Sequence, residues 1–253
     1  MIIDSPSISI IPSLKALWKE AFSDNDEFIN AFFSLGFSEQ RALCVLENKE
    51  LAGALYWFDM EYKDEKIAYI YGVATAKKFR GKGIGTAMMK KAKDHLSDKG
   101  YSAITLVPAQ ESVFGFYKKL GYKVFTHIDN KDFAASVNKT KARKVSVFNY
   151  FEERKKYTQN RYPSLSSESF DFLDYLLEFY IGDDFISAIR KDSKTFSAVE
   201  FIGNLEKCSD FINTLGYKKG TARLMGTATP FAMYLPLNSD YEIPFDYLGF
   251  ALD

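Results

Sequence analysis

The chain is poor in the residues that build metal sites and histidine-dependent catalytic centres. Its 253 residues include two cysteines, Cys44 and Cys208, and two histidines, His95 and His127. The cysteines stand in apolar segments without the close spacing of a zinc site, and we expect free thiols in a reducing compartment. With so few ligands and bases, a metal cluster or a histidine-dependent triad is not expected.

Net charge and long apolar runs are absent as well. The chain has 33 basic and 33 acidic residues, so it lacks the overall charge that attracts nucleic acid or an acidic membrane. No stretch reaches the ~20 apolar residues of a membrane span, and the start MIIDSPSISI does not resemble a secretion signal. We expect a cytoplasmic protein without nucleic-acid or membrane partners. Basic residues exceed acidic ones in residues 1–150, which makes that part the better host for an anion.

The apolar pattern of the first half predicts alternating helices and strands. Helical spacing at Leu14–Phe22 and Glu27–Phe33, the second with Asp24 and Asp26 as possible caps, is followed by three strands joined by polar turns at Ala42–Glu47, Glu50–Met60 and Ile67–Thr75. After a glycine-rich stretch the pattern predicts a helix, a strand, a second helix and two paired strands, at Thr86–Ser97, Ser102–Val107, Val113–Leu120, Tyr122–His127 and Val145–Tyr150. The basic segment 128–144 is predicted to be a solvated loop.

A polar stretch at 152–169 divides the chain, and we predict domains at 1–150 and 151–253. In the second, apolar spacing predicts a helix from Phe172 to Tyr180, a helix at Phe185–Lys191 and a strand at Phe196–Ile202. Residues 116–123, FYKKLGYK, and 211–218, FINTLGYK, share five residue types in register, which suggests an internal duplication. A common local arrangement of helix, glycine and strand would explain the same match.

The stretch RGKGIGTAMM at 80–89 carries the clearest chemical signal. A Walker loop requires Ser or Thr directly after Gly-Lys, but Lys82 is followed by Gly83; a dinucleotide fingerprint requires a third glycine where Thr86 or Met88 stands. Arg-x-x-Gly-x-Gly, between a strand and a helix, does fit. Glycines expose backbone amides and a new helix presents unpaired N–H groups, so an anion is favoured here, and Arg80 and Lys82 indicate a pyrophosphate.

The order of elements and this loop resemble the GNAT acyltransferase superfamily over about residues 10–150. The resemblance extends to the later segment TLVPAQESVFGFYKKLGYKV. It implies an α/β (α+β) fold with a mixed, mostly antiparallel sheet flanked by helices, and a smaller GNAT-like second half. It further implies that acetyl-CoA is bound, with its pyrophosphate and pantetheine arm held by Val73, Ala74, Thr75, Arg80, Gly81, Lys82, Gly83, Ile84, Gly85, Thr86 and Gln110. Gln110 replaces the Asn of many members.

The resemblance also suggests the chemistry, which is N-acetylation of a primary amine by direct transfer. Tyr117 stands where the family often places a general acid, and an unperturbed pKa of ~10 keeps a tyrosine protonated at neutral pH. A backbone N–H near Ala74 would stabilise the oxyanion. No base is evident, because Glu65, Asp59 and Glu61 lie at strand ends, where carboxylates are commonly solvated.

Residues 151–253 lack a glycine loop, and Ile212 takes the place of Tyr117 in the repeat register, so one active site is expected. This half is predicted to line the acceptor site. Its acidic residues would favour a cationic acceptor, although a solvated helix face explains them equally well; they are Asp171, Asp174, Glu178, Asp183 and Asp184. The acceptor is a small-molecule or a peptide amine, and the chain is a monomer or a homodimer. Two alternative functions are an acyl-CoA sensor without activity and a transferase that uses another acyl donor.

Overall fold

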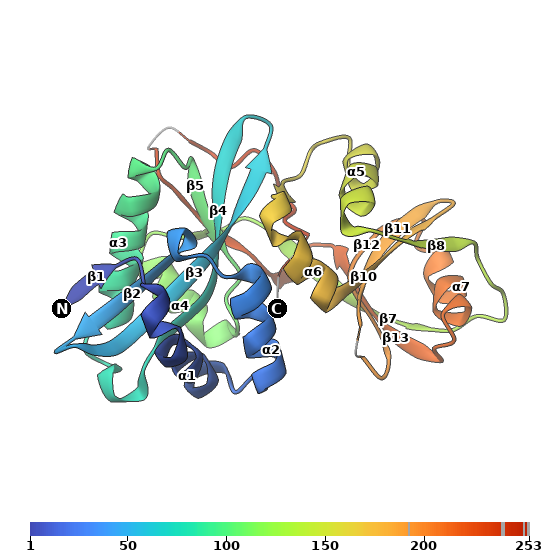
Figure 1. Ribbon diagram of the computed structural model, residues 1–253. Coiled ribbons are helices and arrows are strands. Elements are labelled where there is room, and N and C mark those ends of the chain that lie inside the picture. Colours follow the sequence, from blue (N-terminus) through green and yellow to red (C-terminus); the bar gives the residue numbers. More distant parts are fainter. Residues whose placement is uncertain (192, 239–240, 250, 252–253) are drawn as a thin grey trace. The chain divides into compact units, whose positions relative to one another are not determined.

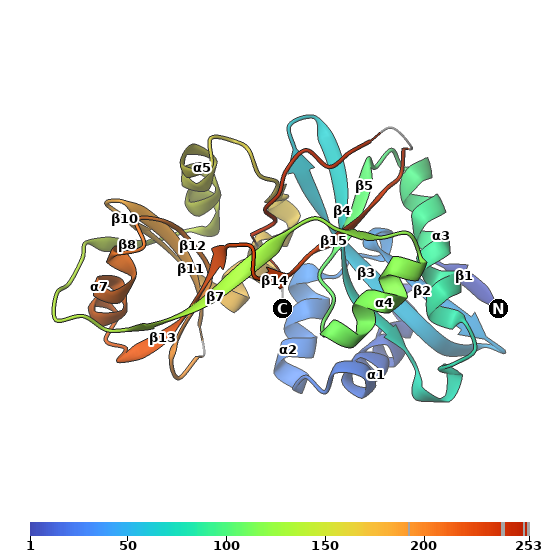
Figure 2. The ribbon, with the colours of Figure 1, turned by 180° about the vertical axis from the view of Figure 1, so that it is seen from behind.

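The computed structural model describes residues 1–191, 193–238, 241–249 and 251. The chain forms two compact units, each made of two separate pieces of sequence (Figures 1 and 2). Unit 1 comprises Met1–Lys123 and Met233–Ile243, and unit 2 comprises Val124–Ala232 and Pro244–Asp253. The boundary expected at 150/151 does not separate these units, because residues 147–157 form one continuous helix inside unit 2.

Unit 1 begins with the two predicted helices. Strand β1 (Ile2–Asp4) leads to α1 (Ile11–Phe22) and α2 (Asp26–Ala31), which continues as a turn of π-helix at Phe32–Gly36. The cap of α2 is Asn25, whose side chain accepts the N–H of Phe28; the two predicted caps, Asp24 and Asp26, flank it. An Asn side chain at this position satisfies a helical N–H that would otherwise lack a partner.

The strands of unit 1 form a mixed sheet, as predicted. Strands β2 (Ala42–Glu47), β3 (Glu50–Tyr62) and β4 (Glu65–Thr75) are antiparallel, and helix α3 (Ile84–Asp98) connects β4 to the parallel strand β5 (Ala103–Leu106). Helix α4 (Phe114–Lys119) follows. These bounds confirm the predicted elements to within a few residues.

Helices cover both faces of this sheet. Neighbouring residues of a strand point to opposite faces. Tyr56 packs on Trp18 of α1, with ring centroids 5.5 Å apart, whereas Trp57 packs on His95 of α3, at 5.7 Å. Helix α1 therefore covers one face and α3 the other.

The last part of the unit 1 sheet comes from a distant part of the chain. Strand β15 (Met233–Pro236) pairs antiparallel with β5, and the sheet order is β1-β2-β3-β4-β5-β15-β6, where β6 is Lys123–Val124. The predicted pairing of 145–150 with 122–127 is wrong. Ser146 instead caps helix α5 (Val147–Tyr157), whose apolar residues Val147, Tyr150 and Phe151 are spaced for a helix.

Unit 2 contains a second sheet with the same plan. Its helices are α5, α6 (Phe170–Leu176) and α7 (Lys207–Thr214). Its strands are β7 (His127–Ala134), β8 (Ala142–Val145), β10 (Leu177–Gly182), β11 (Phe185–Arg190), β12 (Phe196–Gly203), β13 (Lys219–Met225) and β14 (Thr229–Pro230). The remaining short strand, β9, is Ser164–Leu165.

The predictions for the segments that form unit 2 are confirmed only in part. The helix predicted from Phe172 to Tyr180 is helical as far as Leu176, in α6, but residues 177–182 and 185–190 form the antiparallel hairpin β10–β11, joined at Asp183–Asp184. The segment 128–144, predicted to be a solvated loop, contains most of β7. Successive residues of both hairpin strands are mostly apolar because both faces of the sheet are covered. Apolar residues therefore also stand at positions that fit a helical period, although the segments are strands. The strand predicted at Phe196–Ile202 is confirmed.

The seven strands that follow one another across each sheet match in order. The second sheet has the order β8-β10-β11-β12-β13-β7-β14, and its one parallel pair, β12 and β13, flanks α7 as β4 and β5 flank α3. The counterpart of α7 is therefore α3 and not α4, which corrects the repeat register: Gly216-Tyr217 corresponds to Gly100-Tyr101. The assignment of Ile212 as the counterpart of Tyr117 is withdrawn with it.

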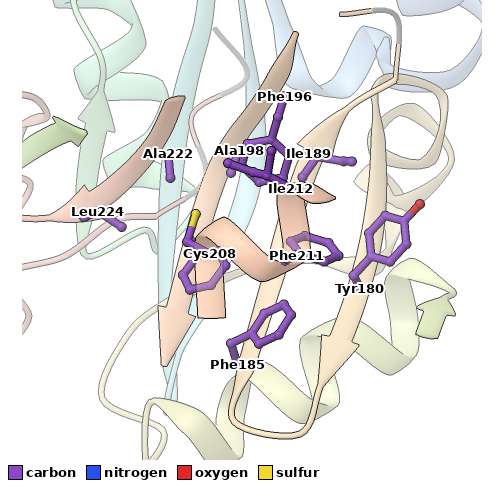
Figure 3. Packing of buried hydrophobic residues seen from close by; sticks show 11 residues of the cluster. Tyr180, Phe185, Ile189, Phe196, Ala198, Cys208, Phe211, Ile212, Ala222 and Leu224 are labelled. Atoms are coloured by element: carbon purple, nitrogen blue, oxygen red, sulfur yellow. The ribbon is translucent and has the colours of Figure 1, made fainter. Parts of the chain in front are cut away.

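Helices also cover both faces of the unit 2 sheet. Phe179 of β10 contacts Tyr150 of α5, with ring centroids 5.0 Å apart, and its neighbour Tyr180 contacts Phe211 of α7, at 5.2 Å. Figure 3 shows the α7 side, where Phe185 and Phe211 face each other within a buried apolar cluster. No helix among the described residues is long and apolar enough to cross a membrane.

Candidate active site

The glycine-rich loop lies between the end of β4 and the start of α3. Gly81 and Gly83 have φ of +74° and +77°, and a Cβ added at either would meet nothing within 4 Å. These two positions are glycine because of backbone conformation and not because of crowding, since L-residues avoid positive φ. The loop backbone can therefore turn sharply while remaining exposed.

The start of α3 presents its first N–H groups without a side-chain cap. Gly83 is the N-cap residue and has no side chain, and the first helical bond runs from the N–H of Ala87 to the carbonyl of Gly83, at 2.9 Å. The amides of Ile84, Gly85 and Thr86 precede that bond. Helices α1, α4, α6 and α7 also lack a side-chain cap, so the missing cap of α3 gains its meaning from the exposed glycines and cations beside it. Such a terminus favours an anion.

Three elements meet at Gly85. Its Cβ position is 3.6 Å from Thr75 Oγ1 at the end of β4 and 3.7 Å from Phe116 Cζ of α4. Arg80, which is exposed, donates from Nε to the carbonyl of Thr75 at 3.1 Å, and this bond holds its guanidinium beside the loop. Lys82 is also exposed, with Nζ 5.3 Å from the centroid of the Phe79 ring. The predicted anion-binding residues are thus gathered in one place.

Strand β4 separates from β5 before it reaches the loop. The last β4–β5 pair in the register is Ile70 with Leu106, so the residues from 71 to 75 extend past β5. Ala74 pairs with Ala54 of β3, while the carbonyl of Thr75 points away from β3 to Arg80. Since a residue's N–H and C=O point to the same side of a strand, Thr75 offers both groups to the side that β5 leaves.

A bulge in β4 marks the same region. The register with β3 shifts between Ala54 and Tyr56, and Gly72 in this gap has φ of +64°. A Cβ on Gly72 would lie 2.9 Å from Trp18 Cζ3 and 3.0 Å from Tyr56 Cδ2, so only glycine fits. Tyr71, Gly72 and Val73 remain partly exposed. The bulge therefore presents strand backbone beside an aromatic cluster.

Tyr117 lies on α4, one residue after the ring that reaches Gly85. Its side chain is buried, and burial raises the pKa of its hydroxyl to about 12. Its ring contacts those of Phe116 and Tyr122, with centroids 5.1 and 5.7 Å away. A hydroxyl with this pKa stays protonated at neutral pH, and the same rise makes it a weaker acid than a free tyrosine. Gln110 is exposed in the connection between β5 and α4.

The carboxylates considered as bases are engaged elsewhere. Asp59 shares the α3 face with Trp57; it accepts the Tyr101 hydroxyl at 2.5 Å and lies 3.3 Å from Lys66 Nζ. Glu65 accepts the hydroxyl of Ser102. Glu61 pairs with Lys66 in the register of the β3–β4 hairpin, at the end remote from the loop. The structure brings none of these three carboxylates to the bulge.

Unit 2 has no comparable loop. Only Asn204, Leu205 and Glu206 separate β12 from α7, and an acidic residue stands at the helix start. The register with β11 also shifts by one residue in β12, but Glu200 beside this shift forms a buried ion pair with Arg154, Nε to Oε2 at 2.8 Å. Gly249 packs against both side chains. Buried side chains thus occupy the place of the open bulge in unit 1.

The acidic residues of unit 2 are partly neutralised. Glu178 accepts a hydrogen bond from Lys144 at 2.7 Å, which lowers the pKa of its carboxyl group, and it also accepts the Tyr180 hydroxyl. Asp174 lies 4.0 Å from Lys191. These ion pairs reduce the negative charge that Glu178 and Asp174 present to a cationic acceptor.

Fold and loop together are those expected of a GNAT domain. They show a mixed sheet in which the parallel strands β4 and β5 separate beside an uncapped helix and the loop Arg80-Gly81-Lys82-Gly83-Ile84-Gly85. The sequence profile of the acetyltransferase (GNAT) domain matches residues 3–125, and this part of the chain belongs to that family.

Known proteins agree with this assignment. Over 58 residues, 23% of this chain, the sequence is 36% identical to an uncharacterized N-acetyltransferase from Chlorobaculum tepidum, and the match spans 36% of that protein. The crystal structure of a GCN5-related N-acetyltransferase from Anabaena variabilis matches 94% of this chain and 73% of its own, with a TM-score of 0.75 and 14% identity. The crystal structure of a GCN5-related N-acetyltransferase from Kribbella flavida matches 92% of this chain and 70% of its own, with a TM-score of 0.68 and 16% identity. At such identities these structures support the fold alone.

Proposed function

We propose that the protein is an acetyl-CoA-dependent N-acetyltransferase that acts on a primary amine by direct transfer. The observation that carries the proposal is the convergence of the uncapped start of α3, the positive-φ glycines and Arg80 at the end of β4. Backbone amides and fixed cations of this kind suit a diphosphate better than a single carboxylate. We propose Arg80, Lys82 and the amides from Gly81 to Thr86 as the diphosphate site.

The thioester arm would lie along β4 where β5 has separated. There the N–H and C=O of Thr75 and the backbone of Val73 would pair with the arm as an added strand would, and Gln110 would contact it from the β5–α4 connection. Bound acetyl-CoA supplies an activated acetyl group. An amide beside Ala74 would stabilise negative charge on the thioester oxygen.

Tyr117 is proposed as the proton donor. During transfer the acceptor nitrogen forms a bond to the acetyl carbon, the carbon–sulfur bond breaks, and the sulfur takes a proton. Tyr117 can give that proton and recover it from solvent or from the acylated nitrogen, because its raised pKa keeps the hydroxyl protonated at neutral pH.

Replacing the donor tests the chemistry directly. Tyr117→Phe is expected to lower kcat by about 100-fold while calorimetry shows an unchanged affinity for acetyl-CoA, because proton donation of this kind contributes ~10²–10⁴ in rate. Thiol release with a panel of amines measures the rate. Tyr122→Phe is the matched control: its ring touches that of Tyr117, its hydroxyl is buried, and full activity is expected.

Two results would refute parts of the proposal. Absence of heat with both CoA and acetyl-CoA would remove the cofactor site. Tight binding of acetyl-CoA without turnover on any amine would instead identify an acyl-CoA sensor or a transferase for another acceptor.

A further inference from the structure

One indole ring connects the β4 bulge to a carboxylate. Trp18 Cζ3 and Cη2 lie 2.9 and 3.1 Å from the position that a Cβ of Gly72 would take. The opposite edge of the same ring donates its N–H to Asp24 Oδ2 at 2.8 Å. Trp18 is 3% exposed, so the ring is held rigidly between the two points. Asp24 is thereby fixed at the width of an indole from the bulge.

The surroundings of Asp24 suit a cation. The carboxylate is partly exposed, and Oδ1 makes no hydrogen bond with any residue in the described part of the chain. Aromatic rings on α1 and α2 adjoin the indole: the centroid of Phe22 lies 5.2 Å from that of Trp18, and that of Phe28 lies 6.3 Å away. Phe22 is 36% exposed. A partly exposed carboxylate close to an aromatic cluster is a favourable environment for an ammonium group.

Asp24 differs in this respect from its neighbour Asp26. Asp26 is exposed and forms an ion pair with Lys19 at 2.7 Å. The hydrogen-bond donor to Asp24 is a neutral indole, which orients the carboxylate without cancelling its charge. No cationic side chain in the described part of the chain forms an ion pair with Asp24, which leaves this carboxylate available to a cationic ligand.

We infer that Asp24 binds a second, non-reacting ammonium group of the acceptor, which makes diamines and longer polyamines the preferred substrate class. The inference rests on the proposed function, in which the reacting amine meets the thioester at the bulge. Because an indole separates Asp24 from the bulge, this carboxylate is too distant to act as the base for that amine. A cation further along the same molecule can reach it. Trp18 is a positioning residue that acts through Asp24.

The test compares α,ω-diamines with monoamines of equal chain length. For the wild-type protein, kcat/KM is expected to be at least tenfold higher for the diamine, with an optimum chain length set by the fixed distance from the bulge. Asp24→Asn is expected to abolish this preference by raising KM for diamines, while kcat/KM for monoamines stays within twofold. Asp26→Asn is the matched control and should retain the preference. Trp18→Phe, which removes the N–H donor, should reduce it.

Calorimetry with the same amines gives a readout that needs no turnover. Diamines should bind the wild-type protein at least tenfold more tightly than monoamines, and Asp24→Asn should abolish the difference. Equal affinity for the two kinds of amine, or equal losses for both in Asp24→Asn, would overturn the diamine site. Absence of CoA binding and of acetyl transfer, with the diamine preference intact, would refute the proposed function alone.

Discussion

At the scale of the residue, Gly83 and Gly85 occupy the same short loop for different physical reasons. Gly83 has a left-handed backbone, which L-residues adopt only at a cost, and its Cβ would meet nothing. Gly85 has no such conformation, and its Cβ would point to Thr75 Oγ1 and Phe116 Cζ at ordinary contact distances. The first glycine shapes the loop, whereas the second keeps space open where β4, α3 and α4 meet.

Two alanine substitutions separate these roles. Gly83→Ala is expected to lower the free energy of unfolding by about 1–2 kcal/mol, because alanine resists positive φ. Gly85→Ala should leave the free energy of unfolding within ~0.5 kcal/mol of wild type, yet weaken acetyl-CoA binding, because its methyl group enters the proposed diphosphate site. Urea unfolding and calorimetry measure the two quantities. Equal stability losses in both variants would contradict the distinction.

At the scale of the element, β15 is the least expected part of the structure. Four residues from Met233 to Pro236 form an internal strand between β5 and β6, more than one hundred positions away in sequence from both. Met233 is fully buried, and its carbonyl accepts the hydroxyl of Thr105. By joining β5 on one side and β6 on the other, β15 supports the segment that carries α4 and Tyr117.

A proline in β15 tests this role. Tyr234→Pro is expected to destabilise unit 1 by ~3 kcal/mol or more, since proline removes an N–H from a strand with neighbours on both sides and is excluded from central strands. Tyr234→Phe keeps the ring and the N–H and serves as the control. Thermal unfolding and limited proteolysis measure the loss. An unchanged unfolding temperature for the proline variant would show that β15 contributes little.

At the scale of the whole molecule, one strand plan occurs twice with different contents. Unit 1 keeps the glycine loop and the exposed bulge, whereas unit 2 has Glu206 at the start of α7 and the buried pair of Arg154 and Glu200 beside its register shift. The two buried side chains of this ion pair fill the place that is open in unit 1. Removing either partner would leave an unpaired buried charge. We therefore expect that unit 2 does not form a second acetyl-CoA site.

Binding stoichiometry checks this conclusion. Calorimetry with acetyl-CoA is expected to give one site per chain, and the double variant Arg80→Ala/Lys82→Ala should lose at least tenfold in affinity at that site. An equivalent charge change outside the loop, Lys155→Ala/Lys156→Ala on α5, should leave affinity unchanged, because these lysines pair with Glu152 and Glu153. Two sites of similar affinity would contradict the difference between the units.

The sequence alone determined the local features of this protein. The first two helices, the strands from β2 to β5 and the helices α3 and α4 follow from spacing within short windows, and the proposed anion-binding role of residues 80–86 follows from glycine chemistry in the same way. In unit 2 the local pattern predicted β12 but failed at β10 and β11, because strands buried on both faces lose the polar alternation that distinguishes them from helices.

Only the tertiary structure decided which distant segments share a sheet. The return of β15 to β5, the entry of β7 into the second sheet, and the position of Trp18 between Gly72 and Asp24 depend on long-range pairing and packing. Short windows of sequence carry no information on such pairing, because the free energy that selects it comes from apolar surface buried when the whole chain folds.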